Sequence, residues 1–274
     1  MAEAVFVRDA ILAQSFIRHV EIHDELGSTN DRAAELAADA DLTLPALILA
    51  KRQTAGRGRG KHTWWSSAGS LTFSVIVNPA SMGIPAADWP RLSLTTGVAM
   101  CDALQREIGE KQDLVDSERR GAVRVAIKWP NDVILDGAKV AGILIESRGA
   151  GAAKDRLTIG IGINVNNTWR SAPRDAGPDG IALCDATCHE HDLQSILLRV
   201  LNALDSRLQQ LAANDTGLPA TWSQLCWLTE QEVEVENNRE WTDGVCVGIA
   251  DDGALLVENV YGTHRIISGS VRAL

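Results

Sequence analysis

Three glycines alternate with three cationic residues from position 56 to 61, and two tryptophans follow at positions 64 and 65. Glycine lets a backbone approach a ligand closely, so N–H groups and cationic side chains can surround phosphate oxygens from several directions. The whole chain carries a net charge of −10, so this cluster is not part of a generally basic surface. The spacing predicts a phosphate-binding loop beside an aromatic surface. A flexible basic loop that contacts nucleic acid is the alternative.

The loop matches neither of two common phosphate-binding motifs. A Walker A loop has the pattern G-x-x-x-x-G-K-[ST]. Aligned on Gly60 and Lys61, it needs a glycine where this chain has Ala55 and a serine or threonine where it has His62. A dinucleotide-binding loop needs G-x-G-x-x-G between a strand and a helix, but here the glycine spacing differs and a strand-like run follows at 71–77. Any phosphate site in this loop must therefore be of another type.

A second polar string, Lys128 to Val133, lies where a buried strand is expected to end. Lys128 places a cation there, and a turn fixed by Pro130 presents Asn131 and Asp132. The lysine could neutralise a carboxylate and a phosphate together, and Asp132 could bind Mg²⁺, which favours carboxylate and water ligands. A strand-end turn with an incidental lysine is the alternative.

Glycines also lie inside two predicted strands, in the strings Gly142-Ile-Leu-Ile-Glu146 and Gly160-Ile-Gly-Ile-Asn164. A glycine within a strand usually marks a bulge or the close approach of a ligand or another backbone. For either string alone, close packing of neighbouring segments would be enough to explain the glycines. Because both belong to the same predicted sheet, together they indicate a ligand that lies over its face.

Composition limits the class of protein. A chain of 274 residues can bury a substantial core, and its apolar runs are too short to span a membrane. The N-terminus has no signal-peptide pattern, and the five cysteines form no C-x-x-C pair, which favours reduced thiols in the cytoplasm. An isoelectric point near 5.1 argues against a dedicated DNA-binding surface.

Hydrophobic periodicity predicts an α+β fold with a small β domain at its end. Ser28, Thr29 and Asn30 should cap a helix over 31–38, and Asp192 should cap a helix with an apolar stripe from 196 to 211. Strands are expected at 46–50, 71–77, 123–129, 139–146 and 157–165, and a further helix at 91–108. Short strands at 232–236, 244–248, 254–258 and 264–267 predict a β-barrel, and the composition changes near Thr221.

The ordered set of strings resembles the biotin protein ligases, or biotin–[acetyl-CoA-carboxylase] ligases. The resemblance runs from about residue 23 to the C-terminus, with anchors at 28–30, 53–66, 128–133, 142–146 and 160–164 in the family's order. It implies the short class without an N-terminal DNA-binding domain. It also implies two domains. Residues 1–221 would form a biotin- and ATP-binding catalytic domain with a class II synthetase-like mixed sheet and flanking helices. Residues 222–274 would form a small SH3-like β-barrel.

The resemblance implies a two-step reaction. Biotin's carboxylate would attack the α-phosphorus of ATP to give biotinyl-5′-AMP, and a lysine of a biotin carboxyl carrier protein would then accept the biotinyl group. Both first reactants are anionic, which gives catalytic roles to Arg57, Arg59 and Lys128, with Mg²⁺ at Asp132. The implied biotin-binding set is Ser28, Thr29, Asn30, Gln53, Gly56, Arg57, Gly58, Arg59, Lys128, Gly142 and Leu144, and the implied ATP-binding set is Arg57, Arg59, Trp64, Lys128, Asn131 and Asn164. The loop should also order over the adenylate and exclude water.

The loop departs from the family's pattern at two positions. Many relatives read G-R-G-R-x-G-R-x-W, whereas Lys61 and His62 stand here in place of the third glycine and the third arginine. Trp64 keeps its spacing from Gly56, so the loop length is unchanged. No role is therefore carried over to Lys61 or His62.

Three alternatives to a biotin ligase are a lipoate or octanoate ligase or transferase of the same fold, a non-catalytic biotin or nucleotide sensor, and a nucleic-acid-binding module. The string from Lys128 to Asp132 matches the biotin branch and not the lipoate branch. The presence of Arg57, Arg59, Lys128 and Asp132 argues against a non-catalytic sensor. The negative net charge argues against a nucleic-acid-binding module. The segment from Cys184 to His191 has zinc-ligand types but lies in a region that the family uses structurally. Because many relatives are dimers, the resemblance also allows a homodimer.

Overall fold

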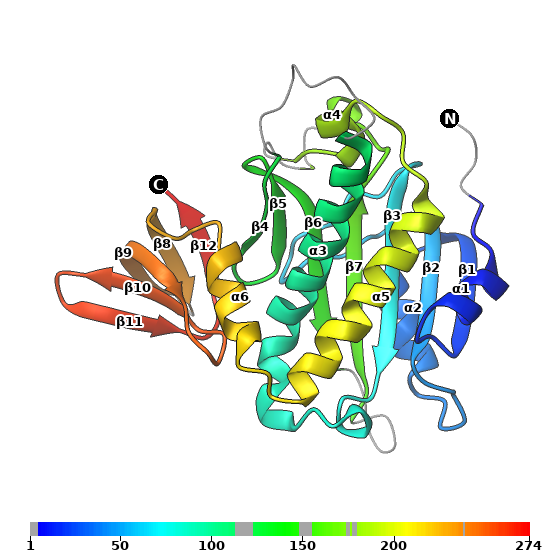
Figure 1. The fold of residues 1–274 in the computed structure, drawn as a ribbon, viewed down its shortest axis with the longest axis horizontal. Helices are drawn as coiled ribbons and strands as arrows, with labels where there is room; N and C mark the ends of the chain where they lie inside the picture. The colour runs from blue at the N-terminus through cyan, green and yellow to red at the C-terminus, as the bar shows by residue number, and fades with distance from the viewer. Residues whose placement is uncertain (1–4, 113–122, 148–154, 174–175, 177–179, 238) are drawn as a thin grey trace.

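The computed structural model describes residues 5–112, 123–147, 155–173, 176, 180–237 and 239–274. A seven-stranded mixed sheet with flanking helices precedes a five-stranded antiparallel sheet, which confirms the predicted α+β class with a small C-terminal β domain. Figure 1 shows the small sheet beside the β4 edge of the large one, and helix α6 (Gly217–Leu225) contacts strands of both.

The large sheet has the strand order β1-β2-β3-β7-β6-β5-β4, in which β1 and β2 are parallel and the other neighbours are antiparallel. Its strands are β1 His19–Leu26, β2 Ala46–Gln53, β3 Ser70–Val77, β4 Val125–Lys128, β5 Asp132–Leu135, β6 Ala138–Glu146 and β7 Leu157–Asn164. The sequence did not predict β1, because this edge strand is mostly polar and buries only Val20.

Two long helices, α3 (Leu92–Gln112) and α5 (Leu193–Ala212), cover one face of the large sheet (Figure 1). The predicted stripe of α5 is buried, and Asp192 caps this helix by accepting a hydrogen bond from the Ser195 N–H at 2.8 Å. Both predictions are confirmed. Two short helices, α1 (Arg8–Gln14) and α4 (Leu183–Thr187), were not predicted. Helix α6 continues through position 221, and the domain boundary placed there stays a prediction.

Alternation along the strands gives the sheet two different faces. In β7, Ile159, Ile161 and Ile163 point into the main core, so the intervening Gly160 and Gly162 lie on the opposite face. Helix α2 (Thr29–Leu36) covers part of that opposite face with a small apolar cluster of its own. At these two positions β7 presents no side chain to that face.

The capping role predicted for residues 28–30 is wrong. Ser28 occupies the N-cap position, but its side chain makes no capping hydrogen bond, and Thr29 and Asn30 lie inside α2. All three residues are buried, with exposures of 4%. Their side chains are therefore available for contacts across the sheet rather than for the helix end.

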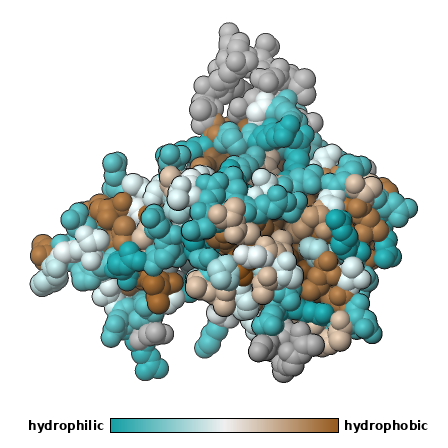
Figure 2. All heavy atoms as spheres, turned by 60° about the horizontal axis from the view of Figure 1, so that its bottom comes forward, coloured by the Kyte–Doolittle hydropathy of each residue, from teal (hydrophilic) through white to brown (hydrophobic). Residues whose placement is uncertain are grey.

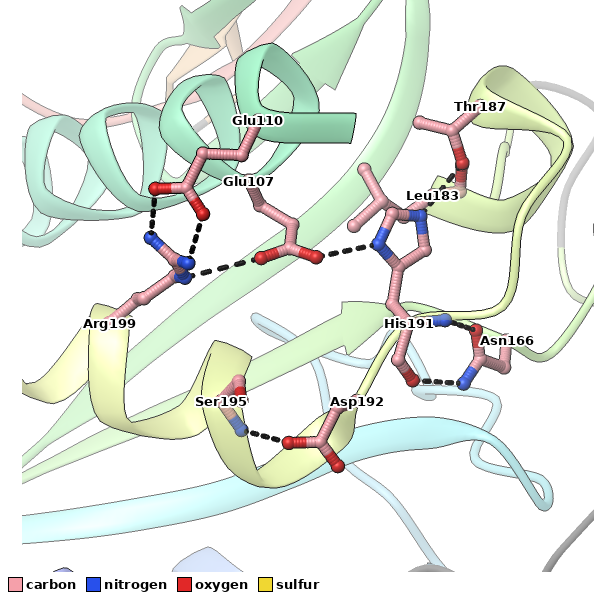
Figure 3. Close-up of polar contacts among 9 residues, drawn as sticks. All are labelled: Glu107, Glu110, Asn166, Leu183, Thr187, His191, Asp192, Ser195 and Arg199. Atoms are coloured by element: carbon pink, nitrogen blue, oxygen red, sulfur yellow. Dashed lines mark hydrogen bonds and ion pairs between the residues drawn. The ribbon is translucent and has the colours of Figure 1, made fainter. Parts of the chain in front are cut away.

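A polar network, buried at Glu107 and His191, ties α3 and α5 to the segments that follow β7 and precede α5 (Figure 3). His191 Nδ1 lies 2.9 Å from Glu107 Oε1, and Arg199 Nε lies 3.2 Å from the other Glu107 oxygen. Arg199 also pairs with Glu110, and the Asn166 amide makes two hydrogen bonds with the backbone of His191. In the part of the chain that the structure describes, no group of three or more His, Cys, Asp or Glu side chains is placed to hold a metal ion. His191 thus has a structural partner in Glu107.

The C-terminal sheet has the strand order β11-β10-β9-β8-β12. Its strands are β8 Glu232–Asn237, β9 Glu240–Ile249, β10 Leu255–Asn259, β11 Gly262–Ile266 and β12 Ser270–Ala273. Its inner face, which includes Val233, Cys246 and Leu255, joins the main core, so the two sheets share one continuous apolar interior. Trp241 and Tyr261 are exposed on this module, and Figure 2 shows brown and teal surface mixed over it on the left. Within the described residues, no helix has both the length and the apolar character needed to cross a bilayer.

Candidate active site

A cleft of about 990 Å³ lies over the glycine face of the large sheet, at the upper end of the range for small-molecule sites. Its walls are the start of α2, the end of β2, the glycine-rich loop, the segment from Lys128 to Asp132, strands β6 and β7, and the ends of β8 and β12. The cleft therefore includes parts of both sheets. Its volume is large enough for two small ligands placed end to end.

All predicted site residues except Gly56 and Asn164 line this cleft. Gly56 is buried against Trp64, since a Cβ added to it would lie 2.5 Å from the Trp64 carbonyl oxygen. Asn164 is 1% exposed, and its side-chain oxygen accepts a hydrogen bond from Asn167 at 3.0 Å. Contact of these two residues with a ligand stays a prediction.

A ring of buried polar groups lies at the α2 end of the cleft. Gln53 Oε1 accepts hydrogen bonds from the backbone N–H of Thr29 at 2.7 Å and from its hydroxyl at 3.1 Å. The Ser74 hydroxyl lies 2.8 Å from Thr29 Oγ1 and 2.6 Å from Asn30 Oδ1. Such a ring can hydrogen-bond a small polar group that is removed from water. Ser74 was not predicted, although a serine in the middle of the apolar strand β3 was a signal for it.

Arg57 is held by two carboxylates at the edge of the cleft. Its Nη1 donates to Glu146 Oε1 at 2.9 Å, and its Nη2 contacts the other Glu146 oxygen and lies 3.0 Å from Asp31 Oδ1. The hydrogen bonds with Glu146, together with both negative charges, raise the pKa of Arg57. Its Nε is buried and has no hydrogen-bond partner within the described residues, so a ligand oxygen could accept from it. The sequence did not identify Asp31 or Glu146 as site residues.

The glycine-rich loop folds back on itself as a short hairpin. Arg57 and Thr63 form an isolated bridge, and the Gly58 N–H donates to the His62 carbonyl at 2.7 Å. Gly60 at the tip has φ +64°, a left-handed conformation that glycine adopts without strain. Arg59 then reaches across the cleft and donates to the carbonyl oxygen of Gly269, between β11 and β12 of the C-terminal sheet.

Trp64 lies over the bare part of β7. A Cβ added to Gly162 would be 2.4 Å from the Trp64 ring, and one added to Gly160 would be 2.1 Å from Asn30 Oδ1. The side chains of Asn30 and Trp64 thus fill the space directly above these two glycines, and a ligand over this face of the sheet stays a prediction. The indole N–H is buried against β7 without a hydrogen-bond partner in the described part of the chain.

Two lysines in the cleft have different electrostatic surroundings. Lys139 Nζ lies 2.7 Å from Asp132 Oδ1. The carboxylate that was predicted to bind Mg²⁺ therefore forms an ion pair with this lysine. Lys128 has no carboxylate partner among the described residues, and its Nζ lies 5.7 Å from the centre of the Trp227 ring. Its charge is therefore available to an anionic ligand. Asn131 instead donates its side-chain amide to the Ile143 carbonyl at 2.9 Å.

Among the described residues, no group of three or more acidic, histidine or cysteine side chains is placed to hold a metal ion, so Mg²⁺ at Asp132 would take few of its ligands from the protein. Mg²⁺ commonly binds in this way, with nucleotide phosphates and water as its remaining ligands. The arrangement is thus suited to an ion that enters with a nucleotide.

Comparisons with known proteins agree with this geometry. Residues 25–164 match the model of the biotin/lipoate A/B protein ligase family. The chain is 30% identical to the biotin–[acetyl-CoA-carboxylase] ligase of Paracoccus denitrificans, over 89% of this chain and 96% of the relative. It is also 30% identical to the enzyme of that name from Mycobacterium tuberculosis, over 97% of this chain and 93% of the relative.

A solved structure gives the same result for the fold. The biotin protein ligase from Aquifex aeolicus, in complex with biotin and ATP, matches with a TM-score of 0.78 and 26% identity, over 94% of this chain and all of that one. This match confirms the class II synthetase-like architecture that the resemblance implied. The chain belongs to the biotin/lipoate A/B protein ligase family.

Proposed function

We propose that this protein is a biotin–[acetyl-CoA-carboxylase] ligase, which activates biotin with ATP and transfers it to a lysine of a biotin carboxyl carrier protein. The observation that carries the proposal is one cleft in which a buried polar ring, a glycine-rich cationic loop and an unpaired Lys128 lie together. Nearly full-length similarity to two ligases of that name supports it. The acidic balance and the unpaired cysteines support a cytoplasmic protein that does not bind DNA, and a homodimer stays a prediction.

In the first step, the ring of Ser28, Thr29, Asn30 and Gln53 would hold the ureido end of biotin by hydrogen bonds. The biotin carboxylate then attacks the α-phosphorus of ATP, a new O–P bond forms, and the bond to pyrophosphate breaks. Two anions must approach each other, so cations are needed where their charges meet. Lys128 suits this role because no described carboxylate neutralises it.

The other charged groups of the cleft would assist the same step. Arg57 and Arg59 would stabilise the phosphate oxygens, and Trp64 would pack beside the adenine. Mg²⁺ at Asp132 would neutralise charge on the ATP phosphates. No side chain of the cleft has to form a covalent bond with the substrate.

In the second step, an unprotonated lysine amine of the carrier protein attacks the carbonyl carbon of the adenylate. The C–N bond forms, the C–O bond to AMP breaks, AMP leaves, and the amine loses its extra proton to solvent. Water is a competing nucleophile, so the glycine-rich loop has to cover the intermediate until the carrier arrives.

The test is the exchange of labelled pyrophosphate into ATP in the presence of Mg²⁺ and biotin. Wild type should catalyse exchange only with biotin, and Lys128→Ala should lower the rate by roughly 100-fold or more, as expected for the loss of a preorganised charge. Lys51→Ala is the matched control, because Lys51 pairs with Asp24 outside the cleft.

Other outcomes would favour the alternatives. Exchange that depends on lipoate or octanoate and not on biotin would assign the protein to the other branch of the family. A folded protein that binds biotin without supporting any exchange would be a sensor.

A further inference from the structure

Glu146 ends strand β6 on the cleft face and contacts two different predicted binding residues. One carboxylate oxygen accepts from the Asn30 side-chain amide at 2.9 Å, and both oxygens accept from Arg57. The Glu146 side chain is 18% exposed, so these charge-assisted bonds lie partly out of water.

The contact with Glu146 determines which way the Asn30 amide faces. The carboxylate of Glu146 and the carbonyl of Leu144, 3.2 Å from Asn30 Nδ2, can only accept hydrogen bonds. The NH₂ group of Asn30 must therefore face them, and Oδ1 faces the Ser74 hydroxyl in the polar ring. An acceptor in that ring is what the N–H groups of a cyclic urea require.

The same carboxylate fixes the Arg57 guanidinium. Two of its nitrogens are engaged by Glu146, while Nε remains buried without a partner among the described residues. Arginine presents its donors in a rigid planar fork, so holding one side of the fork sets the direction of the remaining N–H groups. An anionic group bound in the cleft could then accept from an arginine that is already oriented.

We propose that Glu146 is a positioning residue for biotin: its single carboxylate orients Asn30 for the ureido ring and Arg57 for the carboxylate end. The inference rests on the proposed function. Recognition of the two ends of biotin is then coupled through a residue that need not touch biotin itself. Loss of this carboxylate should affect biotin more than ATP, because Arg59 and Lys128 remain to bind phosphate.

Steady-state pyrophosphate exchange with Glu146→Gln tests this inference. The KM for biotin should rise about 10- to 100-fold, the range expected for lost hydrogen bonds to a charged group, with a smaller rise for ATP. Glu35→Gln is the matched control, since this exposed glutamate pairs with Arg32 on α2, the helix that also carries Asn30. Its KM values should equal those of wild type.

Double variants separate positioning from general damage. In an Asn30→Ala or an Arg57→Lys background, Glu146→Gln should raise the KM for biotin by a much smaller factor than it does in wild type, because its effect acts through those residues. Urea unfolding and calorimetric binding of biotin show whether each variant is folded. If Glu146→Gln does not fold, Glu146→Asp serves instead, since the shorter side chain keeps the charge but cannot reach both partners.

Three results would overturn the inference: a biotin KM for Glu146→Gln equal to that of wild type, a lower biotin KM, or fully multiplicative double variants. A lower KM would mean that Glu146 competes with biotin for Arg57. The proposed function is tested separately, because its failure would remove biotin-dependent exchange from wild type as well.

Discussion

Two glycines of β7 show how single residues shape this site. Gly160 and Gly162 alternate with core isoleucines, and each lies against one side chain that the cleft needs, Asn30 and Trp64 respectively. Real side chains do not place a Cβ within 3.0 Å of such neighbours, so neither position tolerates even alanine without movement. The absence of a side chain at these two points is therefore part of the site.

Gly162→Ala should displace the Trp64 ring from β7. We expect a loss of stability of about 1–3 kcal/mol, as for other overpacked sites, and a rise in the KM for ATP of about tenfold if Trp64 packs beside adenine. Gly109→Ala is the control, because this helical glycine of α3 has open space around it and alanine favours helices. Urea unfolding and pyrophosphate exchange measure the two effects. Unchanged ATP kinetics in a Gly162→Ala variant would contradict the placement of Trp64 at the nucleotide.

The residues that the sequence identified and those that it missed differ in a physical way. Arg57, Arg59 and Lys128 stand in strings whose composition alone indicates anion binding. Glu146 lies 89 residues from Arg57 and 116 from Asn30, and its contacts depend on which strands are neighbours. Local spacing does not contain that information. For the same reason, the filling of the glycine face by Trp64 could not be predicted.

Among the elements, α2 is attached to the edge of the sheet by an ion pair. Arg32 of α2 donates to both carboxylate oxygens of Glu21 in β1, at 3.0 Å and 2.9 Å. These hydrogen bonds lower the pKa of Glu21 from 4.5 to about 2. Because α2 also carries Thr29 and Asn30, this ion pair fixes a wall of the cleft to the edge of the sheet.

The stabilisation from this pair should depend on pH. A carboxylate whose pKa falls on folding stabilises the native state above its unfolded pKa, and the contribution is lost as the pH falls from about 4.5 towards 2. Since both side chains are partly exposed, we expect roughly 1–2 kcal/mol rather than the full equivalent of the shift. Arg32→Ala should therefore lower the free energy of unfolding by that amount near pH 7 and by much less near pH 3.

Urea unfolding at the two pH values measures this difference, with Arg106→Ala as the control. Arg106 makes an exposed pair with Glu110 four residues away on α3, and such pairs contribute little. A deficit in Arg32→Ala that stays constant with pH would mean that the arginine stabilises α2 by packing alone.

Elements with a strong local pattern were predicted well, and the placement of both glycine strings in one mixed sheet is confirmed, but the order of the strands was not predicted. The strands of the glycine strings and the α5 stripe follow directly from the alternation and the helical spacing of apolar residues. Strand β1 lacks such a pattern, and its parallel pairing with β2 is non-local. The order β3-β7-β6, which brings the two glycine strings together, likewise depends on long-range pairing.

At the scale of the whole molecule, the cleft depends on both sheets. The C-terminal sheet supplies one wall, and its inner face continues the core of the large sheet. Arg59 joins the glycine-rich loop to this wall through the Gly269 carbonyl. If the loop covers a bound adenylate, as we propose, this attachment would give the small sheet a part in retaining the intermediate.

Arg59→Gly should therefore weaken closure over the adenylate. With the side chain gone, the loop loses both its contact with the C-terminal sheet and a cation for the phosphate, so biotinyl-5′-AMP should dissociate about 10- to 100-fold faster. Release of labelled adenylate from enzyme freed of excess substrate measures this rate, and Arg265→Gly, which removes an exposed pair with Asp252 outside the cleft, is the control. Faster release should appear as adenylate in solution and as lower biotinylation of the carrier per ATP consumed. An unchanged dissociation rate would mean that the loop retains the adenylate without the Arg59 contact.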